Sequence, residues 1–174
     1  MIAVKNLIII SGPPGAGKTE AARNLLEMLT GAAWLDGDWC WMMHPWRFTP
    51  ENKAMVEANI SFVLGQLLQN RSFSHVIFSW VLPRREILNR LLDRTGLKPG
   101  RDYAVVTVTL TCDPQVLSGR PKARGRSLSR RHQALRSLRA ENVPGSVRVD
   151  TTNLPPRQVA EKILKALEMP SLGG

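Results

Sequence analysis

The chain has 174 residues, of which 43% are hydrophobic and 22% charged, and it carries a net charge of +10. This composition is typical of one globular domain and excludes a disordered chain, a collagen-like repeat and a small disulfide scaffold. The two cysteines, Cys40 and Cys112, are too far apart for a CxxC metal motif, and no apolar run reaches the ~18 residues of a membrane span. We therefore expect a cytoplasmic protein with no membrane partner.

Apolar runs alternate with helix-like stretches, a pattern typical of parallel strands joined by helices. We predict five strands, which cover residues 5–11, 32–36, 75–82, 103–112 and 146–150. We predict four helices, which cover residues 18–29, 50–69, 83–93 and 155–167. Residues 119–125 lack an apolar period and are predicted to form a loop, and residues 127–140 fit a basic helix. These elements predict an α/β fold with helices on both faces of the sheet.

A glycine-rich segment after the first predicted strand matches GxxxxGK[ST] at each fixed position. The segment is Gly12-Pro13-Pro14-Gly15-Ala16-Gly17-Lys18-Thr19, and a predicted helix follows it. Glycines let several backbone N–H groups point at one anion, and the helix N-terminus adds partial positive charge. In such loops the lysine reaches the β- and γ-phosphates, and the hydroxyl binds Mg²⁺. The motif therefore predicts that these residues and Glu20 bind a nucleoside triphosphate.

Two carboxylates, Asp36 and Asp38, follow the second predicted strand. Ligands of open α/β sheets bind beyond the carboxyl ends of the strands, so one carboxylate can help to hold Mg²⁺ while the other orients an attacking hydroxyl or takes its proton. The alternative is a surface turn, because Asp-Gly is a common turn dipeptide. The third predicted strand carries no acid, which makes Asp36 the expected metal carboxylate and counts against a motor-type ATPase or a GTPase switch.

The phosphate loop, the Leu35-Asp36-Gly37-Asp38 step and the tail Val149-Asp150-Thr151-Thr152-Asn153 together resemble small P-loop kinases. Adenylylsulfate kinases carry a similar loop and a similar Leu-Asp-Gly-Asp step, and shikimate, gluconate and chloramphenicol-phosphotransferase-like kinases share the layout. The resemblance covers nearly the whole chain. It implies one three-layer P-loop kinase domain over residues 1–174, with a five-stranded parallel sheet in the order 2-3-1-4-5 and a mobile lid at about residues 119–140.

The resemblance also implies the use of ATP with Mg²⁺ and roles for individual residues. Asp38 takes the position of the catalytic base, and Asp36 lies near the metal. Arg124 or Arg126 matches the lid arginine that closes on the transferring phosphate. The residues that match those around the adenine are Arg120, Asn153, Leu154 and Pro155.

The acceptor cannot be carried over from these families. The segment after Asp38 is unlike that of adenylylsulfate kinases, and the glycine triplet of shikimate kinases is missing after the third predicted strand. Four of the five tryptophans lie between Trp34 and Trp46, where an apolar or planar acceptor can pack or where the rings cover the sheet as core. The candidate acceptor-binding residues, each with a structural role as the alternative, are Trp39, Trp41, His44, Arg84 and Arg85.

Basic residues concentrate near the expected lid. Between Arg120 and Glu141 lie seven arginines and one lysine against one acid, so this segment supplies +7 of the +10. A surface that binds single-stranded nucleic acid interleaves aromatic side chains for stacking, and this segment has none, which counts against a nucleic-acid partner.

We therefore predict an enzyme, a kinase that transfers the γ-phosphoryl group of ATP to a hydroxyl of a small molecule. Thr19 and Asp36 are predicted to position Mg²⁺. The predicted catalytic residues are Lys18, Asp38, Arg124 and Arg126. One alternative is a nucleoside monophosphate kinase, whose acceptor needs no base. Another alternative, of a different class, is a nucleic-acid-acting or non-catalytic nucleotide-binding protein.

Overall fold

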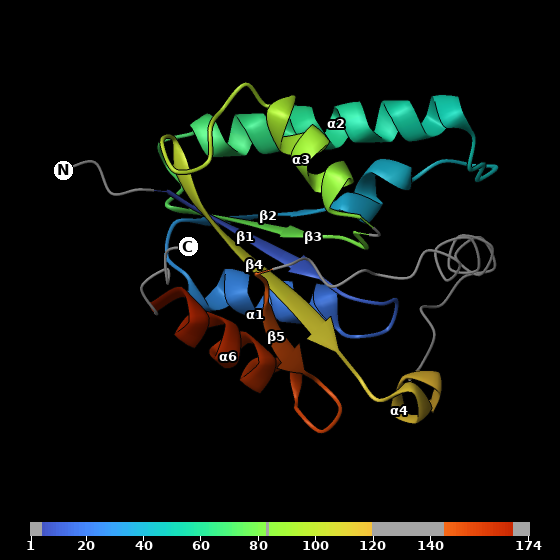
Figure 1. Cartoon of the computed structure of the whole chain (residues 1–174), viewed down its shortest axis with the longest axis vertical. Coiled ribbons are helices and arrows are strands. Elements are labelled where there is room, and N and C mark those ends of the chain that lie inside the picture. The colour runs from blue at the N-terminus through green and yellow to red at the C-terminus, as the bar shows by residue number, and fades with distance from the viewer. Residues whose placement is uncertain (1–4, 83, 120–144, 169–174) are drawn as a thin grey trace.

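A parallel sheet forms the middle layer of the protein (Figure 1). The computed structural model describes residues 5–82, 84–119 and 145–168. Five strands pair in the predicted order β2-β3-β1-β4-β5, and every neighbouring pair is parallel. The strands are β1 (Lys5–Ser11), β2 (Ala32–Asp36), β3 (His75–Ser79), β4 (Tyr103–Thr111) and β5 (Val147–Asp150).

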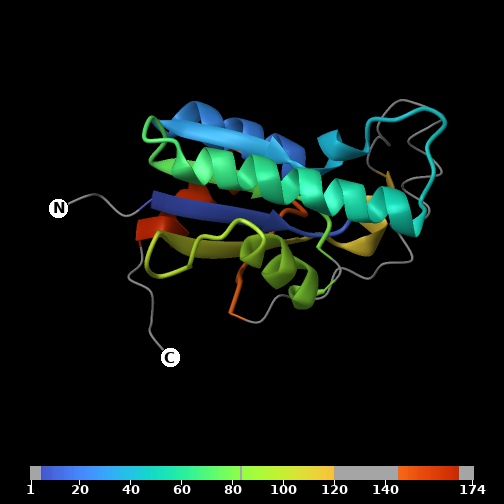
Figure 2. The same ribbon diagram turned by 90° about the horizontal axis from the view of Figure 1, so that it is seen from above.

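Helices cover both faces of this sheet, which confirms the three-layer architecture. Figures 1 and 2 show α2 and α3 on one face, and Figure 1 shows α1 and α6 on the other. No helix in the described ranges is long and apolar enough to cross a membrane. The helices are α1 (Lys18–Met28), the 3₁₀ helix η1 (Gly37–Trp41), α2 (Pro50–Gln69), α3 (Arg85–Asp93), α4 (Pro114–Gly119) and α6 (Pro156–Glu168).

The central strand β1 explains why the sheet is buried on both sides. Its apolar run from Leu7 to Ile10 is fully buried, as expected for a strand between two neighbours in a parallel sheet. Leu7 and Ile9 join the core under α2 and α3, whereas Ile8 and Ile10 join the core over α1 and α6. Each of these side chains contributes about 1.5–3 kcal/mol by burial, so the strand that leads into the glycine-rich loop is firmly held.

Two predicted elements are shorter by two or three residues in the structure, and two short helices were not predicted. β3 ends at Ser79 instead of residue 82, because its edge neighbour β2 ends opposite it at Asp36. α3 begins at Arg85 instead of residue 83. The short helices η1 and α4 begin at aspartate side chains, since Asp36 accepts a hydrogen bond from Asp38 N and Asp113 accepts from Gln115 N. Three predictions fall outside the described residues beyond Gly119. They are the loop at 119–125, the basic helix at 127–140 and the lid.

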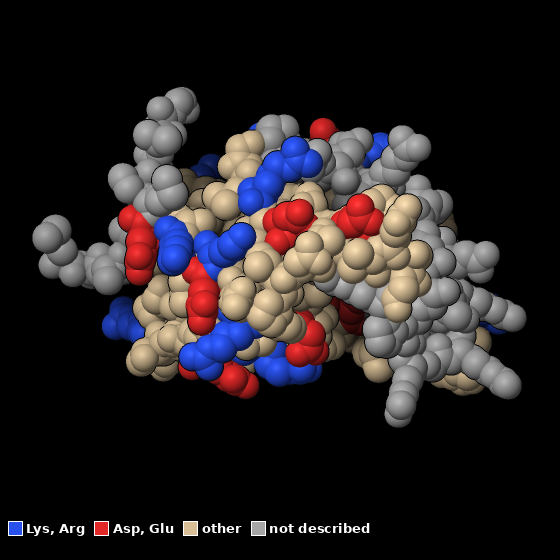
Figure 3. Space-filling view, turned by 90° about the horizontal axis from the view of Figure 1, so that it is seen from below, with Lys and Arg blue, Asp and Glu red and all other residues tan. Residues whose placement is uncertain are grey.

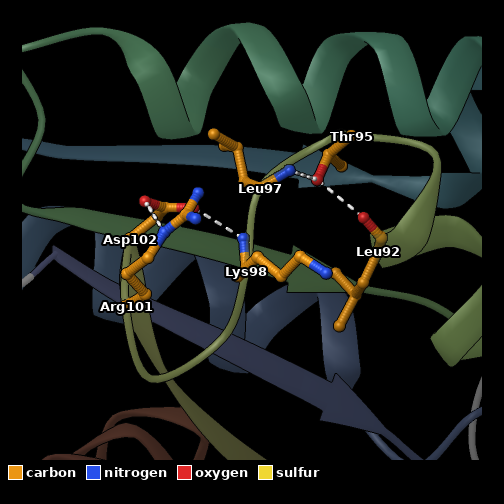
Figure 4. Close-up of polar contacts among 6 residues, drawn as sticks. All are labelled: Leu92, Thr95, Leu97, Lys98, Arg101 and Asp102. Carbon is orange, nitrogen blue, oxygen red and sulfur yellow. Dashed lines mark hydrogen bonds and ion pairs between the residues drawn. The ribbon is translucent and has the colours of Figure 1, made fainter.

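Side-chain hydrogen bonds fix the connection from α3 to β4, at the amino edge of the sheet (Figure 4). Thr95 Oγ1 donates to Leu92 O at 2.6 Å, and Asp102 Oδ2 accepts from Lys98 N at 2.7 Å. Arg101 pairs with Asp102 at 2.9 Å and holds the pKa of that carboxyl below its usual value. This edge lies opposite the carboxyl ends of the strands, where the predicted site residues gather.

Candidate functional site

The glycine-rich loop joins β1 to α1 at the carboxyl edge of the sheet. Gly12, Gly15 and Gly17 have φ values of 147°, 85° and 94°, a region that favours glycine. Gly12 also packs on the neighbouring strand, because a Cβ atom there would lie 2.6 Å from Leu110 O. The loop therefore needs glycine for its backbone shape and for its approach to β4.

Lys18 lies over this loop. Its Nζ donates to the carbonyl oxygens of Gly12 and Pro13, both at 2.9 Å. Removal of the ammonium from water lowers the pKa of Lys18 to about 8, and the carboxylates of Asp38 and Asp36 oppose the shift. The ammonium is thus close to the two aspartates. It is anchored by neutral backbone carbonyl oxygens, which phosphate oxygens can replace.

Asp36 contacts the first turn of α1. Its carboxylate ends β2 and is 6% exposed. Its Oδ2 accepts from Thr19 Oγ1 at 3.2 Å, and its Oδ1 accepts from Asp38 N at 2.9 Å. Burial raises its pKa, and so does the Asp38 carboxylate, whereas the hydrogen bonds from Asp38 N, Thr19 and Ser79 lower it. A cation bound here would favour the charged form.

Ser79 was not among the predicted site residues. It ends β3 directly opposite Asp36 and is 1% exposed. Its Oγ accepts a hydrogen bond from Trp34 Nε1 at 2.9 Å. The sequence contained a signal for it, because the strand that lacks an acid at its carboxyl end has this hydroxyl there instead.

The tryptophans that follow Asp38 divide between the core and the surface. Trp41 is 4% exposed and packs in the core with α2 and with the ring of Phe48, so we assign it to the core and not to an acceptor surface. Trp39 is 50% exposed, and its ring centroid lies 4.8 Å from that of Trp34. Trp39 is therefore the predicted aromatic residue that a ligand can reach.

The other predicted acceptor residues are exposed. His44 lies in the loop between η1 and α2. Arg84 and Arg85 lie at the start of α3, after the carboxyl end of β3. None of the three has a hydrogen bond that ties its side chain to the aspartates among the described contacts, so their place in the site remains a prediction from the sequence.

A shallow recess of about 350 Å³ opens at the carboxyl ends of β4 and β5. Beside the recess, the next residues of the chain are Leu154, which is half-buried, and Pro155, which is exposed. Thr151 connects the recess to the phosphate loop, because its Oγ1 is shared between Ala16 O at 3.1 Å and Thr111 O at 3.0 Å. The recess is lined by Thr111, Cys112, Asp113, Asp150, Thr152 and the predicted Asn153.

The predicted basic residues Arg120, Arg124 and Arg126 lie outside the described residues. On the α1 and α6 face, the described Lys and Arg side chains are interspersed with Asp and Glu (Figure 3). The visible part of this face therefore has no continuous basic surface of the kind that tracks a nucleic-acid backbone.

The site residues fit a magnesium ion better than an all-protein metal cage. The described part of the chain holds no group of three or more His, Cys, Asp or Glu side chains that could bind a metal ion. Thr19 and Asp36 do bring a hydroxyl and a carboxylate within 3.2 Å. Mg²⁺ takes oxygen ligands and is commonly held by one or two carboxylates with waters and substrate phosphates, so this pair suits Mg²⁺ next to a bound nucleotide.

Comparisons with solved structures agree with the fold. A gluconokinase from Sinorhizobium meliloti 1021 is 20% identical, with a TM-score of 0.66 over 96% of this chain and 93% of that chain. The Deinococcus radiodurans tunicamycin resistance protein is 21% identical, with a TM-score of 0.60 over 95% and 97%. The Mycobacterium tuberculosis APS kinase, solved with AMPPNP and APS, is 14% identical, with a TM-score of 0.65 over 95% and 99%.

These similarities confirm the predicted fold of small P-loop kinases. A comparison with curated proteins gives no match. A family model described as an AAA domain matches residues 8–143, which is more than half of the chain and includes the phosphate loop and both aspartates. The chain therefore belongs to this AAA domain family of P-loop proteins and has the small P-loop kinase fold.

Proposed function

We propose that the protein is an ATP- and Mg²⁺-dependent kinase that transfers the γ-phosphoryl group to a hydroxyl of a small molecule. One observation carries the proposal, namely the position of Asp36 and Asp38 beside the phosphate loop. Asp36 contacts Thr19 at 3.2 Å, and both carboxylates act electrostatically on Lys18. A phosphate loop with one carboxylate for the metal and a second for an acceptor hydroxyl is the minimum set for this reaction.

The nucleotide is held mainly by Lys18 and by the backbone N–H groups of the loop residues other than Pro13 and Pro14, which have no N–H. On binding, the Lys18 ammonium exchanges the carbonyl oxygens of Gly12 and Pro13 for β- and γ-phosphate oxygens. The resemblance to small P-loop kinases supports Asn153, Leu154, Pro155 and Arg120 as the surroundings of the adenine. Asn153 lines the recess beside β5, which is consistent with this role.

Thr19 and Asp36 position Mg²⁺. The Thr19 hydroxyl and the Asp36 carboxylate, which lie 3.2 Å apart, would hold the ion, and the ion would supply positive charge beside the phosphates. Mg-ATP supplies the phosphoryl group and neutralises part of its charge. The remaining catalysis is positioning and charge stabilisation by the protein.

Asp38 orients the acceptor hydroxyl and accepts its proton as the new bond forms. Its backbone N–H is bound to Asp36, so the metal carboxylate and the base are fixed to one another. Arg124 and Arg126, proposed from the sequence and outside the described residues, neutralise charge on the transferring group.

The acceptor side is formed by Trp39, His44, Arg84 and Arg85. Trp39 offers an exposed ring that suits the flat face of a sugar or an aromatic group. The similarity to a protein named as a gluconokinase supports a hydroxylated small molecule as the acceptor.

The test is ADP release from Mg-ATP across a panel of acceptors, with GTP as a second donor. The panel holds sugars, sugar acids, nucleosides, nucleoside monophosphates, hydroxylated antibiotics and short oligonucleotides. Stimulation by a hydroxyl acceptor that is lost in Asp38→Asn, and kept in the matched control Asp93→Asn on α3, supports the proposal. Stimulation by a monophosphate that survives Asp38→Asn indicates a nucleoside monophosphate kinase. Strongly salt-dependent binding of oligonucleotides without phosphorylation indicates a nucleic-acid-binding protein.

A further inference from the structure

We propose that Ser79, held by Trp34, is a positioning residue that keeps the Asp36 carboxylate oriented for binding of the Mg²⁺–nucleotide complex. This inference rests on the proposed function. It goes beyond it because neither residue belongs to the phosphate loop or to the aspartate pair.

The three side chains lie on one face of the sheet. Asp36 and Ser79 are register partners in the β2–β3 ladder, so their side chains leave the sheet on the same side. Trp34 is two residues before Asp36 on β2 and therefore points to that side as well. This is the face that carries α1, whose first turn contains Thr19.

The hydrogen bonds run in one direction along this group. An indole N–H can only donate, and Trp34 Nε1 donates to Ser79 Oγ at 2.9 Å. The Ser79 hydroxyl proton is then free to be donated toward the Asp36 carboxylate, its partner in the ladder, where it favours the charged form. Because Ser79 is almost completely buried, water does not compete for this proton.

Three separate elements consequently bring a donor to Asp36. Thr19 of α1 and the N–H of Asp38 in η1 each donate a hydrogen bond to it, and the Ser79 hydroxyl of β3 lies at the facing position of the ladder. A carboxylate fixed in this way presents its remaining lone pairs in one direction, which is what a metal ion or its bound water requires. Loss of such an outer partner typically reduces metal affinity about 10- to 100-fold.

The experiment measures the affinity for ADP by calorimetry, once with Mg²⁺ and once with EDTA. Ser79→Ala should weaken binding of Mg-ADP about 10- to 100-fold and leave binding of ADP in EDTA unchanged. The Mg²⁺ response is the gain in ADP affinity on going from EDTA to Mg²⁺. Ser79→Thr keeps the hydroxyl and should restore most of this response. Trp34→Phe keeps an aromatic ring without the N–H donor and should reduce the response in the same direction, by a smaller factor.

Ser61→Ala is the matched control. Ser61 is also a buried serine, but its Oγ donates to Glu57 O within α2, away from the site. This variant should bind Mg-ADP as the wild type does. If Ser79→Ala does not fold, Trp34→Phe tests the same hydrogen-bond chain from its other end.

Two results would overturn the inference. An unchanged Mg²⁺ response in Ser79→Ala or, if that variant does not fold, in Trp34→Phe would show that the hydroxyl does not orient Asp36. Equal weakening with Mg²⁺ and with EDTA would show a general structural role. Either result leaves the acceptor assay and its Asp38→Asn test untouched. The two tests can also disagree in the other direction. If the wild type phosphorylates none of the panel but Ser79→Ala selectively loses the Mg²⁺ response, the proposed function is contradicted and the role of Ser79 is supported.

Discussion

The indole ring of Trp80 lies so close to Gly37 that a Cβ atom at residue 37 would be 2.5 Å from Trp80 Cγ. Gly37 is the residue between Asp36 and Asp38, and Trp80 directly follows β3. The ring is buried in the core under α2 and α3. The backbone N–H of Trp80 donates to Ile10 O of β1 at 3.1 Å. The spacing of the two aspartates is therefore set by core packing as well as by the local chain.

Replacement of Gly37 by alanine should disturb both stability and the site. The added methyl group cannot fit without a shift of the ring or of the aspartate backbone, so we expect a loss of about 1–3 kcal/mol in the free energy of unfolding. We also expect weaker binding of Mg-ADP. Urea denaturation and calorimetry measure the two effects.

Gly65→Ala is the control for this variant. A Cβ atom at residue 65 would make only ordinary contacts of 3.7–3.8 Å with Thr95, and the position is inside α2. Alanine there should stabilise the helix by about 0.5–1 kcal/mol. A Gly37→Ala protein as stable and as active as the wild type would contradict the packing argument.

Nucleotide affinity should fall as the pH rises above about 8. The pKa of Lys18 is lowered to about 8 in the ligand-free protein, and bound phosphates favour its charged form. Binding therefore takes up a proton above this pH, and the affinity should decrease by up to about tenfold per pH unit, while it stays level below. The measurement is ATP binding in EDTA between about pH 7 and about pH 9.5. Lys18→Met should bind weakly at every pH and show no such slope.

Removal of the exposed ring of Trp39 should affect the acceptor and spare the nucleotide. Trp39→Ala should raise the KM of the acceptor found in the panel about 3- to 10-fold, as expected for the loss of one stacking contact, with little change in kcat. Phe62→Ala removes another exposed aromatic ring, which lies on α2, and should change neither constant. Equal effects of the two substitutions would argue against contact between Trp39 and the acceptor.

The ion pairs between α2 and α3 should show strong non-additivity. The buried carboxylate of Glu57 lies 3.1 Å from Arg90 and 3.8 Å from Arg94. Arg90→Ala or Arg94→Ala alone leaves Glu57 one cationic partner, whereas the double variant leaves a buried charge without either of them. We expect about 1 kcal/mol or less for each single variant and about 3–5 kcal/mol for the double variant in urea denaturation. Additive losses would indicate that the two pairs act independently.

The strands, the helices and the phosphate loop were predictable because they depend on local patterns, whereas the order of the strands in the sheet was expected from the resemblance to small P-loop kinases. The β1 run, the glycines of the loop and the order of strands and helices can be read from residues that are neighbours in sequence. The contact between Thr19 and Asp36 was also expected, since both follow strands at the same edge of the sheet. The sequence predicted that Thr19 and Asp36 act together there, and the structure supplied the distance between them.

The remaining features depend on register and packing, which the sequence does not specify. Ser79 contributes to the site only because β3 ends level with β2, and a shift of one residue would turn it to the other face. Trp39 and Trp41 are two residues apart, but η1 places one at the surface and the other in the core. The turn of η1 itself depends on the side chain of Asp36, which a search for regular periodicity does not detect.

The hydrogen bond from Thr151 to Ala16 joins residues that are 135 positions apart in the chain. The phosphate loop is made well before residue 151, and the hydroxyl that supports its Ala16 carbonyl arrives only after β5 has been added to the sheet. A ribosome-bound chain that ends before residue 151 lacks this support. The complete site is therefore formed only once residue 151 has emerged and β5 has joined the sheet, well after the phosphate loop itself has been made.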